Sequence, residues 1–209
     1  MTSPFSQYFQ INQLKMCEQD LALFNNLIAK NPVRLFFDTE TTGLGNADRI
    51  INMCIVECDF QTMKMRYFES LFNPEGRSIA PGAFAVHKIS SQSLKYQPTF
   101  AQIAGDILEF VNNRTLIAHN KQFDKRMLNN ELARCSHNLI ANNKFECTLE
   151  MARIAFPGLK NSLQDLCERF NVDHSNRTVH GALIDTLLLA QIYPHLLVKY
   201  TKNLPEIQG

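Results

Sequence analysis

Val33-Arg34-Leu35-Phe36-Phe37-Asp38-Thr39-Glu40 is the stretch that decides the fold, because an apolar strand runs directly into two acids. Residues 33–37 indicate a short buried strand, and residues 38–46 a polar loop that contains glycine. Side chains alternate along an extended chain, so Asp38 and Glu40 project from the same face. Two neighbouring carboxylates repel each other, and burial makes their charge more costly still. A proton, a basic side chain or a metal cation must therefore compensate the pair.

A divalent cation is the compensating group that this part of the sequence favours. No lysine or arginine follows the two acids closely, and Arg49 is the nearest one downstream. Carboxylate oxygens are hard ligands that suit magnesium or manganese. The alternative at this point is that Asp38 and Glu40 both lie solvated at the end of the strand.

A second unusual acid is Asp185, which lies in a segment that is apolar on nearly every side. Residues 180–199 are expected to form a helix, and a helix with this pattern is buried. Asp185 therefore lacks an obvious solvent-exposed face. The alternative explanation is an acid close to a helix N-terminus, where the helix dipole favours negative charge.

His180 precedes Asp185 by five residues, which puts the two side chains roughly 140° apart on an ideal helix. They serve one site only if His180 lies at or before the helix start and reaches across from the loop. That position would keep the imidazole partly hydrated, as a base near neutral pH should be. A surface or helix-capping histidine is the alternative.

A third acid, Asp124, is expected in the first turn of a helix over residues 122–135, directly after a strand over residues 115–118. Stabilisation by the helix dipole competes with a functional role here. Asn120 and the flat ring of Phe123 suit contact with a nucleotide, and both also fit a structural role.

The remaining pattern predicts one α/β domain built on a mixed sheet. The chain has 209 residues, of which 45% are apolar, which is enough for one domain with a real core. A capping box formed by Ser162 and Asp165 is expected to start one helix. The expected helices span residues 10–30, 99–112, 122–135, 147–156, 162–170 and 180–199, and the expected strands span 33–37, 49–59, 63–72 and 115–118.

The overall composition excludes some classes of protein. A formal net charge of +1 argues against a strongly basic protein that wraps nucleic acid. It is compatible with a protein that grips a few nucleotides at a chain end, but does not favour one. Cys54 and Cys58 share one face of an expected strand, and buried thiols explain the six scattered cysteines better than zinc does. We find no secretory signal and no apolar run of about 20 residues, so we expect a cytoplasmic location and no membrane span.

Taken together, three segments resemble the motifs of the DEDDh exonucleases, and among these the epsilon-type proofreading exonucleases of bacterial DNA polymerase III. The three segments are residues 37–44, 119–124 and 180–185. Residues 83–89, and residues 152–158 together with 161–163, are similar to the same subfamily. The likeness covers roughly residues 33–200.

The resemblance implies a ribonuclease-H-like α/β fold, with a mixed five-stranded sheet flanked by helices. It implies a 3′→5′ exonuclease that acts on a nucleic-acid 3′ end, single-stranded DNA being expected, and releases nucleoside 5′-monophosphates. Two divalent cations, Mg²⁺ or Mn²⁺, would be held by four carboxylates, and His180 would take a proton from the attacking water. The four carboxylates are Asp38, Glu40, Asp124 and Asp185.

By the same resemblance, the stretch from Thr39 to Thr42, including Thr41, would supply backbone contacts to the terminal nucleotide. Leu44 and Phe123 would pack on its base, because such stacking tolerates any base. For these two residues a place in the core is the alternative. Asn120 completes the expected substrate-binding set.

Three features depart from the resemblance. Cys147 stands where many relatives have an acid, which should tune activity rather than abolish it. Only 24 residues follow Asp185, so we expect no polymerase-binding tail, although a DNA polymerase remains an expected partner. Residues 1–31 form an additional N-terminal helical extension before an exonuclease domain of residues 32–209. Its apolar stripe is expected to pack on the domain, with docking of a partner as the alternative.

The cellular role has two further alternatives. One is a free-standing exonuclease for DNA repair or for trimming RNA or short oligonucleotides, because sugar preference depends on geometry that the sequence does not reveal. The other is an inactive nucleic-acid-binding module. Loss of one of the acids or of the histidine would mark such a module, and all five residues are present.

Overall fold

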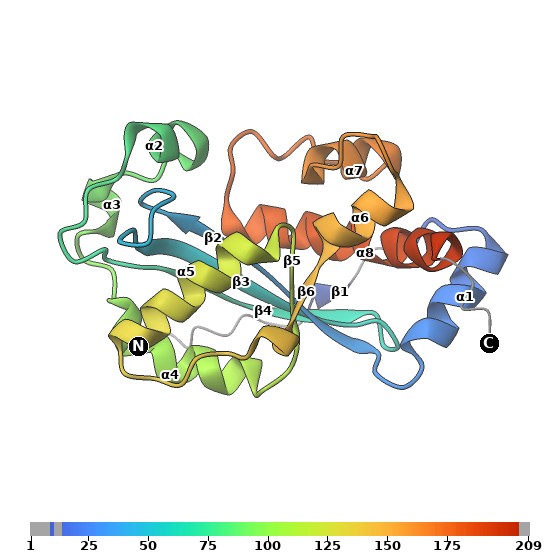
Figure 1. Ribbon diagram of the computed structural model, residues 1–209, viewed down its shortest axis with the longest axis horizontal. Coiled ribbons are helices and arrows are strands. Elements are labelled where there is room, and N and C mark those ends of the chain that lie inside the picture. The colour runs from blue at the N-terminus through green and yellow to red at the C-terminus, as the bar shows by residue number, and fades with distance from the viewer. Residues whose placement is uncertain (1–8, 11–13, 205–209) are drawn as a thin grey trace.

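The protein is described by a computed structural model, which describes residues 9–10 and 14–204. A sheet with strand order β1-β4-β3-β2-β5-β6 forms its centre, and helices cover both faces (Figure 1). The strands are β1 Phe9–Gln10, β2 Val33–Thr41, β3 Ile50–Asp59, β4 Lys64–Leu71, β5 Leu116–Ala118 and β6 Phe145–Cys147. The helices are α1 Glu18–Ile28, α2 Pro81–His87, α3 Ser91–Leu94, α4 Phe100–Val111, α5 Lys121–Arg134, α6 Thr148–Ala155, α7 Leu163–Arg169 and α8 Ala182–Asn203.

The sheet is mixed, as predicted. β2, β3 and β4 form an antiparallel meander, whereas β5 and β6 run parallel to β2. These five strands are the predicted five-stranded sheet, although β6 was not recognised in the sequence. The N-terminal segment adds β1, a two-residue strand beside Lys64 and Met65 of β4, where the sequence predicted helix from residue 10.

β2 is longer than predicted, because it continues through Thr41 instead of ending at Phe37. Asp38 pairs with Cys54 of β3, and Glu40 pairs with Asn52. The expected polar loop from residue 38 is therefore wrong for its first four residues. The antiparallel partner strand satisfies the main chain of these residues and so holds both acids in extended conformation.

The two faces of the sheet carry separate cores because consecutive strand residues point in opposite directions. Phe36 packs with residues of α1, α6, α7 and α8, whereas Phe37 packs with residues of α4 and α5. Figure 1 shows these two helical layers on opposite sides of the strands. An apolar run without alternation is what a strand buried on both faces requires.

The helix α1 covers one end of this core, although it begins at Glu18 and is shorter than predicted. Phe24 and Ile28 are buried. The ring of Phe24 meets that of Phe60 edge to face, with ring centroids 5.3 Å apart. The residues of the predicted extension before Phe9, together with residues 11–13 and 205–209, lie outside the described part of the chain.

The helix α8 is long and apolar enough to cross a membrane by length and composition alone, which the sequence analysis did not anticipate. It lies against β2 and β3, and 61% of its most apolar window is buried inside the fold. That burial is the behaviour of a core helix. The first turn of α8 therefore reaches the ends of the central strands.

Candidate active site

Four carboxylates from three separate elements lie at one end of the central strands. Asp38 and Glu40 come from β2, Asp124 from the first turn of α5, and Asp185 from the first turn of α8. The carboxylate of Asp38 interacts electrostatically with each of the other three. The structure thus brings together all four of the acids selected from the sequence.

Burial and mutual repulsion raise the pKa values of three of these acids, Asp38, Glu40 and Asp124. Burial, followed by the neighbouring charges of Asp124, Asp185 and Glu40, raises the pKa of Asp38 well above its usual value. Burial and the charge of Asp185 raise the pKa of Glu40 to about 7. Burial also raises the pKa of Asp124 to about 7, against the hydrogen bonds from Thr39 that lower it. Full ionisation at neutral pH therefore needs added positive charge.

Asp124 is fixed by a neighbouring strand residue. Its Oδ1 accepts hydrogen bonds from the backbone N–H of Thr39 at 3.1 Å and from the Thr39 hydroxyl at 2.8 Å. The chain turns from β5 into α5 at Asn120, which has a left-handed backbone with φ 76°. Asparagine tolerates this conformation better than most residues. Asn120 is exposed and lines neither of the cavities described below.

Asp185 differs from the other three acids because a guanidinium neutralises it. Arg177 Nε lies 2.6 Å from Asp185 Oδ1, and Arg177 Nη2 lies 2.7 Å from Asp185 Oδ2. Burial alone would raise the pKa of Asp185, but the hydrogen bonds from Arg177 and His180 outweigh it and hold the pKa below its usual value. The sequence analysis searched for a basic partner only close after the first acids and so missed Arg177.

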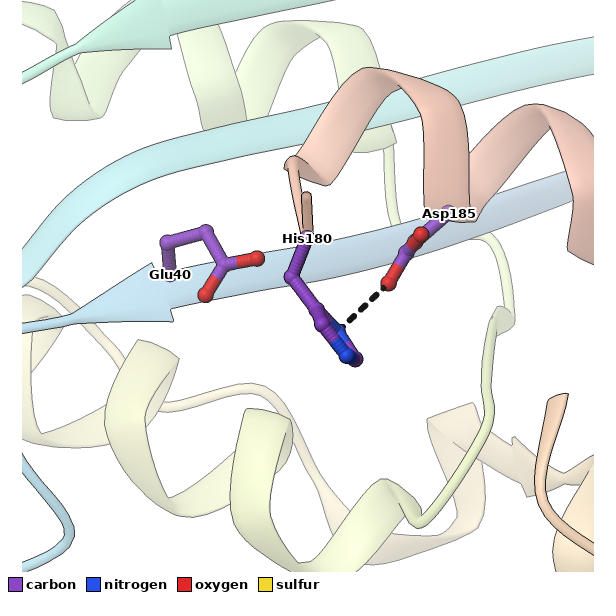
Figure 2. Close-up of side chains that lie close together, drawn as sticks. All are labelled: Glu40, His180 and Asp185. Carbon is purple, nitrogen blue, oxygen red and sulfur yellow. Dashed lines mark ion pairs between the residues drawn. The ribbon is translucent and has the colours of Figure 1, made fainter. Parts of the chain in front are cut away.

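His180 precedes α8 and reaches back towards Asp185, as Figure 2 shows. Its backbone N–H donates to the carbonyl of Val86 at 3.3 Å, and its ring Nδ1 lies 3.1 Å from Asp185 Oδ2. The His180 side chain is 47% exposed. The imidazole therefore lies at the boundary between the buried acids and solvent, where it can exchange protons with water.

The chemistry of these residues fits hard divalent cations. One ligand atom from each of Glu40, His180 and Asp185 lies within 4.8 Å of the others. Among the residues that the structure describes, Asp38, Glu40 and Asp124 form no ion pair with lysine or arginine. Buried carboxylates without enough cationic partners are costly, and oxygen ligands are those that Mg²⁺ and Mn²⁺ prefer.

An apolar cavity of about 330 Å³ opens beside Glu40. It is lined by Thr39, Glu40, Thr41, Gly43, Leu44, Ala80, Gly82, Ala83, Val86, His87 and Phe123. Leu44 is 78% exposed, so its alternative place in the core is excluded. Phe123 is partly buried and packs against the core while also lining the cavity.

Thr42 does not line this cavity. Its side chain is buried, and its hydroxyl donates to Asp48 Oδ1 at 2.9 Å. Asp48 also accepts from Gly45 N and from Arg77. A Cβ on Gly43 would lie 2.6 Å from Asp48 Oδ2, so this position has no room for a side chain. These contacts shape the turn that presents Leu44.

A second, polar cavity of about 360 Å³ opens beside Asp38 and Asp185. It is lined by Asp38, His119, Ser162, Leu163, Gln164, Arg177, His180 and Asp185. His119 Nδ1 lies 3.1 Å from the Thr148 hydroxyl, and burial lowers the pKa of His119 to about 4. The sequence analysis missed His119 as a site residue, although it is the first residue of the second motif.

Comparison with known proteins gives the family. The sequence model of the RNase_T family, described as an exonuclease, matches residues 35–193. The DNA polymerase III epsilon subunit of Rickettsia felis is 42% identical over 167 residues, which are 78% of this chain and 72% of that protein. The epsilon subunit of Escherichia coli K12 is 34% identical over 170 residues, covering 77% of this chain and 69% of that protein.

Solved structures agree on the fold. Exonuclease X in complex with 5′ overhanging duplex DNA aligns with a TM-score of 0.63 at 24% identity, covering 84% of this chain and 99% of that chain. The nuclease domain of 3′hExo, a DEDDh family member bound to rAMP, aligns with a TM-score of 0.65 at 16% identity, covering 79% and 92%. The resemblance inferred from the motifs is thus confirmed, and the chain belongs to the RNase_T exonuclease family.

Proposed function

We propose that this exonuclease removes nucleotides one at a time from the 3′ end of single-stranded DNA, releases nucleoside 5′-monophosphates, and serves replication proofreading in the cytoplasm. The convergence of four carboxylates from three elements, beside an apolar and a polar cavity, is the observation that carries the proposal. Similarity to epsilon subunits of DNA polymerase III supports the proofreading role and a polymerase as partner.

Asp38, Glu40, Asp124 and Asp185 are the proposed ligands of two divalent cations, Mg²⁺ or Mn²⁺. When bound, such ions activate water and neutralise the negative charge that develops on the departing 3′ oxygen. The raised pKa values of Asp38, Glu40 and Asp124 support this role, because only a strong positive charge keeps all of them ionised at neutral pH.

His180 is the proposed general base, which takes a proton from the attacking water onto an unprotonated ring nitrogen. Its position before the helix and its exposed side chain support this role. The backbone hydrogen bond to Val86 keeps the ring within reach of Asp185.

The apolar cavity is the proposed site of the terminal nucleotide. Leu44 and Phe123 would pack on its base without selecting a particular one, since every base offers an apolar face. Thr39 and Thr41 line the same cavity and would contact the sugar and phosphate. Thr42 would act by shaping the turn, and Asn120 by directing α5, in place of direct contact with the nucleotide.

We also propose that residues 1–31 are an extension to the exonuclease domain of residues 32–209. The start of the family match at residue 35 supports this division. The burial of Phe24 and Ile28 supports an extension that packs on the domain in place of docking a separate partner.

The first test uses single-stranded DNA labelled at its 5′ end, incubated with Mg²⁺ or Mn²⁺. Stepwise shortening from the 3′ end is expected for the wild type, and a loss of at least 100-fold in rate for Asp185→Asn. Full activity in Asp185→Asn would refute the proposed ligand set. Glu109→Gln is the matched control, because Glu109 is an exposed acid on α4 and should cleave at the wild-type rate.

The proofreading role needs a separate comparison of paired and mismatched primer-templates, with and without the host polymerase. Faster removal of mismatched ends only when the polymerase is present supports proofreading. A clear preference for short RNA over DNA of the same sequence would replace it with the trimming role. Absence of shortening with either metal would favour an inactive binding module.

A further inference from the structure

Arg177 holds two of the proposed catalytic groups at once. Its Nε and Nη2 take both carboxylate oxygens of Asp185, and the same Nη2 lies 2.8 Å from His180 Nδ1. The side chains of Arg177 and Asp185 are only 11% and 6% exposed. A two-point, buried contact of this kind fixes the guanidinium much more firmly than a surface ion pair does.

The hydrogen-bond chemistry of Arg177 shows what this contact blocks. A guanidinium carries only donors, and Nη2 of Arg177 lies 2.8 Å from Nδ1 and 3.3 Å from Nε2 of His180. While this contact lasts, the guanidinium covers the edge of the imidazole that carries its nitrogens. Both oxygens of Asp185 are likewise engaged by donors, as long as Arg177 remains in place.

A divalent cation and Arg177 would compete for Asp185. A cation bound by Asp185 lies close to its oxygens, and two positive groups on one buried carboxylate repel each other. Arg177 has space to move, because it also lines the polar cavity together with Ser162 and Gln164. The negative group that a bound nucleic-acid strand brings to this cavity is a phosphate, for which a guanidinium is a strong partner.

We propose that Arg177 has two positions: it masks Asp185 and His180 while the site is empty, and it exchanges Asp185 for a phosphate of the bound strand when cations and substrate load. Arg177 is thereby a resting-state counter-ion and also a positioning residue for the substrate. The inference rests on the proposed cation site at Asp185 and assigns this chain a further residue for the same reaction.

The test measures Mn²⁺ binding without nucleic acid, by electron paramagnetic resonance of free Mn²⁺, in the wild type and in Arg177→Gln. Removal of the competitor should tighten Mn²⁺ binding by roughly tenfold, which corresponds to about 1.4 kcal/mol. At saturating Mn²⁺, the same variant should cleave labelled single-stranded DNA at least tenfold more slowly, because the phosphate loses its guanidinium. Tighter cation binding with slower cleavage is a combination that a merely structural role would not produce.

The variant Arg153→Gln is the matched control, because it removes the same charge from an exposed arginine that does not contact the four acids. Its Mn²⁺ affinity should stay within about twofold of the wild type. Should Arg177→Gln fail to fold, Arg177→Lys keeps the charge but loses the two-point contact, and it should also bind Mn²⁺ more tightly than the wild type. Unchanged or weaker Mn²⁺ binding in the folded variant overturns the inference, as does undiminished cleavage at saturating Mn²⁺.

The Asp185→Asn variant separates failure of this inference from failure of the proposed function. If the wild type binds Mn²⁺ and Asp185→Asn does not, the cation site is real and Arg177→Gln tests the inference alone. If the wild type and Asp185→Asn bind Mn²⁺ equally, Asp185 is not a ligand, and the proposed ligand set and the inference fall together.

Discussion

At the scale of single residues, Glu40 illustrates a conflict between function and stability. Its carboxylate is buried beside Asp185 and Asp124, and its pKa is raised to about 7. Above that pH the metal-free protein must carry this charge without compensation, which opposes folding. A residue that the proposed cation site needs thus lowers the stability of the metal-free protein.

We expect Glu40→Gln to stabilise the metal-free protein while it abolishes cleavage. The neutral amide removes a buried charge at pH 8, so thermal unfolding in EDTA should occur several degrees higher, since about 1 kcal/mol shifts Tm by roughly 2–4 °C at this chain length. The DNA-shortening assay should show a loss of at least 100-fold. Glu109→Gln, an exposed acid changed in the same way, should alter neither property. A lower melting temperature for Glu40→Gln would contradict this account of the site.

The pH dependence of stability follows from the same pKa shifts. Because the pKa values of Asp38, Glu40 and Asp124 are raised in the folded protein, the folded state binds more protons than the unfolded chain from about pH 4 to pH 7. The free energy of unfolding of the metal-free protein should therefore fall as pH rises through this window. The contribution of Asp185 to the free energy of unfolding changes with pH in the opposite direction. Because the pKa of Asp185 is lowered in the folded protein, its contribution is fully present above the pKa of the unfolded chain and is lost as the pH falls.

Urea unfolding at pH 5, 6, 7 and 8 measures this dependence, once in EDTA and once in Mn²⁺. The free energy of unfolding should decline towards pH 8 in EDTA but not in saturating Mn²⁺, because the cations replace the protons on the three acids. A free energy of unfolding that rises from pH 5 to pH 8 in EDTA would mean that the three acids are compensated in another way.

At the scale of elements, α1 is expected to contribute to the stability of the whole domain. Phe24 is fully buried against Phe60, whose ring stacks on that of Tyr193 in α8. Phe24→Ala should lower the free energy of unfolding by about 3–5 kcal/mol, as large-to-small changes of buried phenylalanines do. Urea unfolding checks this value. Asn25→Ala, an exposed neighbour on the same helix, should change it by less than about 0.5 kcal/mol.

Long elements with a clear pattern were predictable from the sequence, whereas short or distant ones were not. The 22 residues of α8 and the 12 of α4 carry their apolar pattern over several turns. β6 has three residues and gains its strand conformation only by pairing with β5, so no local pattern marks it. β1 depends in the same way on two residues of β4.

The residues of the candidate site also differ in how far the sequence alone could reveal them. Asp38, Glu40 and Asp185 stood out because each acid interrupts an apolar element, which is a local contradiction visible in the sequence. Arg177 is an ordinary arginine in a polar loop, and only the path of the chain between α7 and α8 brings it onto Asp185. Contacts of this kind are set by the fold and leave no local signal.

At the scale of the whole molecule, the near-neutral charge should limit electrostatic attraction to nucleic acid. The formal net charge is +1, and several of the described arginines already form ion pairs with acidic side chains of the protein. A site that grips only a few phosphates should show a shallow salt dependence, with a slope of log K against log salt no steeper than about −3 for single strands. Fluorescence anisotropy of a labelled oligonucleotide with the inactive Asp185→Asn variant measures this slope. A slope near −6 would reveal an extended basic track on the surface.

The distribution of the four acids over β2, α5 and α8 has a consequence for protein synthesis. Synthesis proceeds from the N-terminus, so a growing chain that already contains Asp38, Glu40 and Asp124 still lacks His180 and Asp185. No nascent fragment that stops before α8 carries all of the proposed cation ligands. The proposed site can therefore bind its cations as a complete set only after α8 has been made.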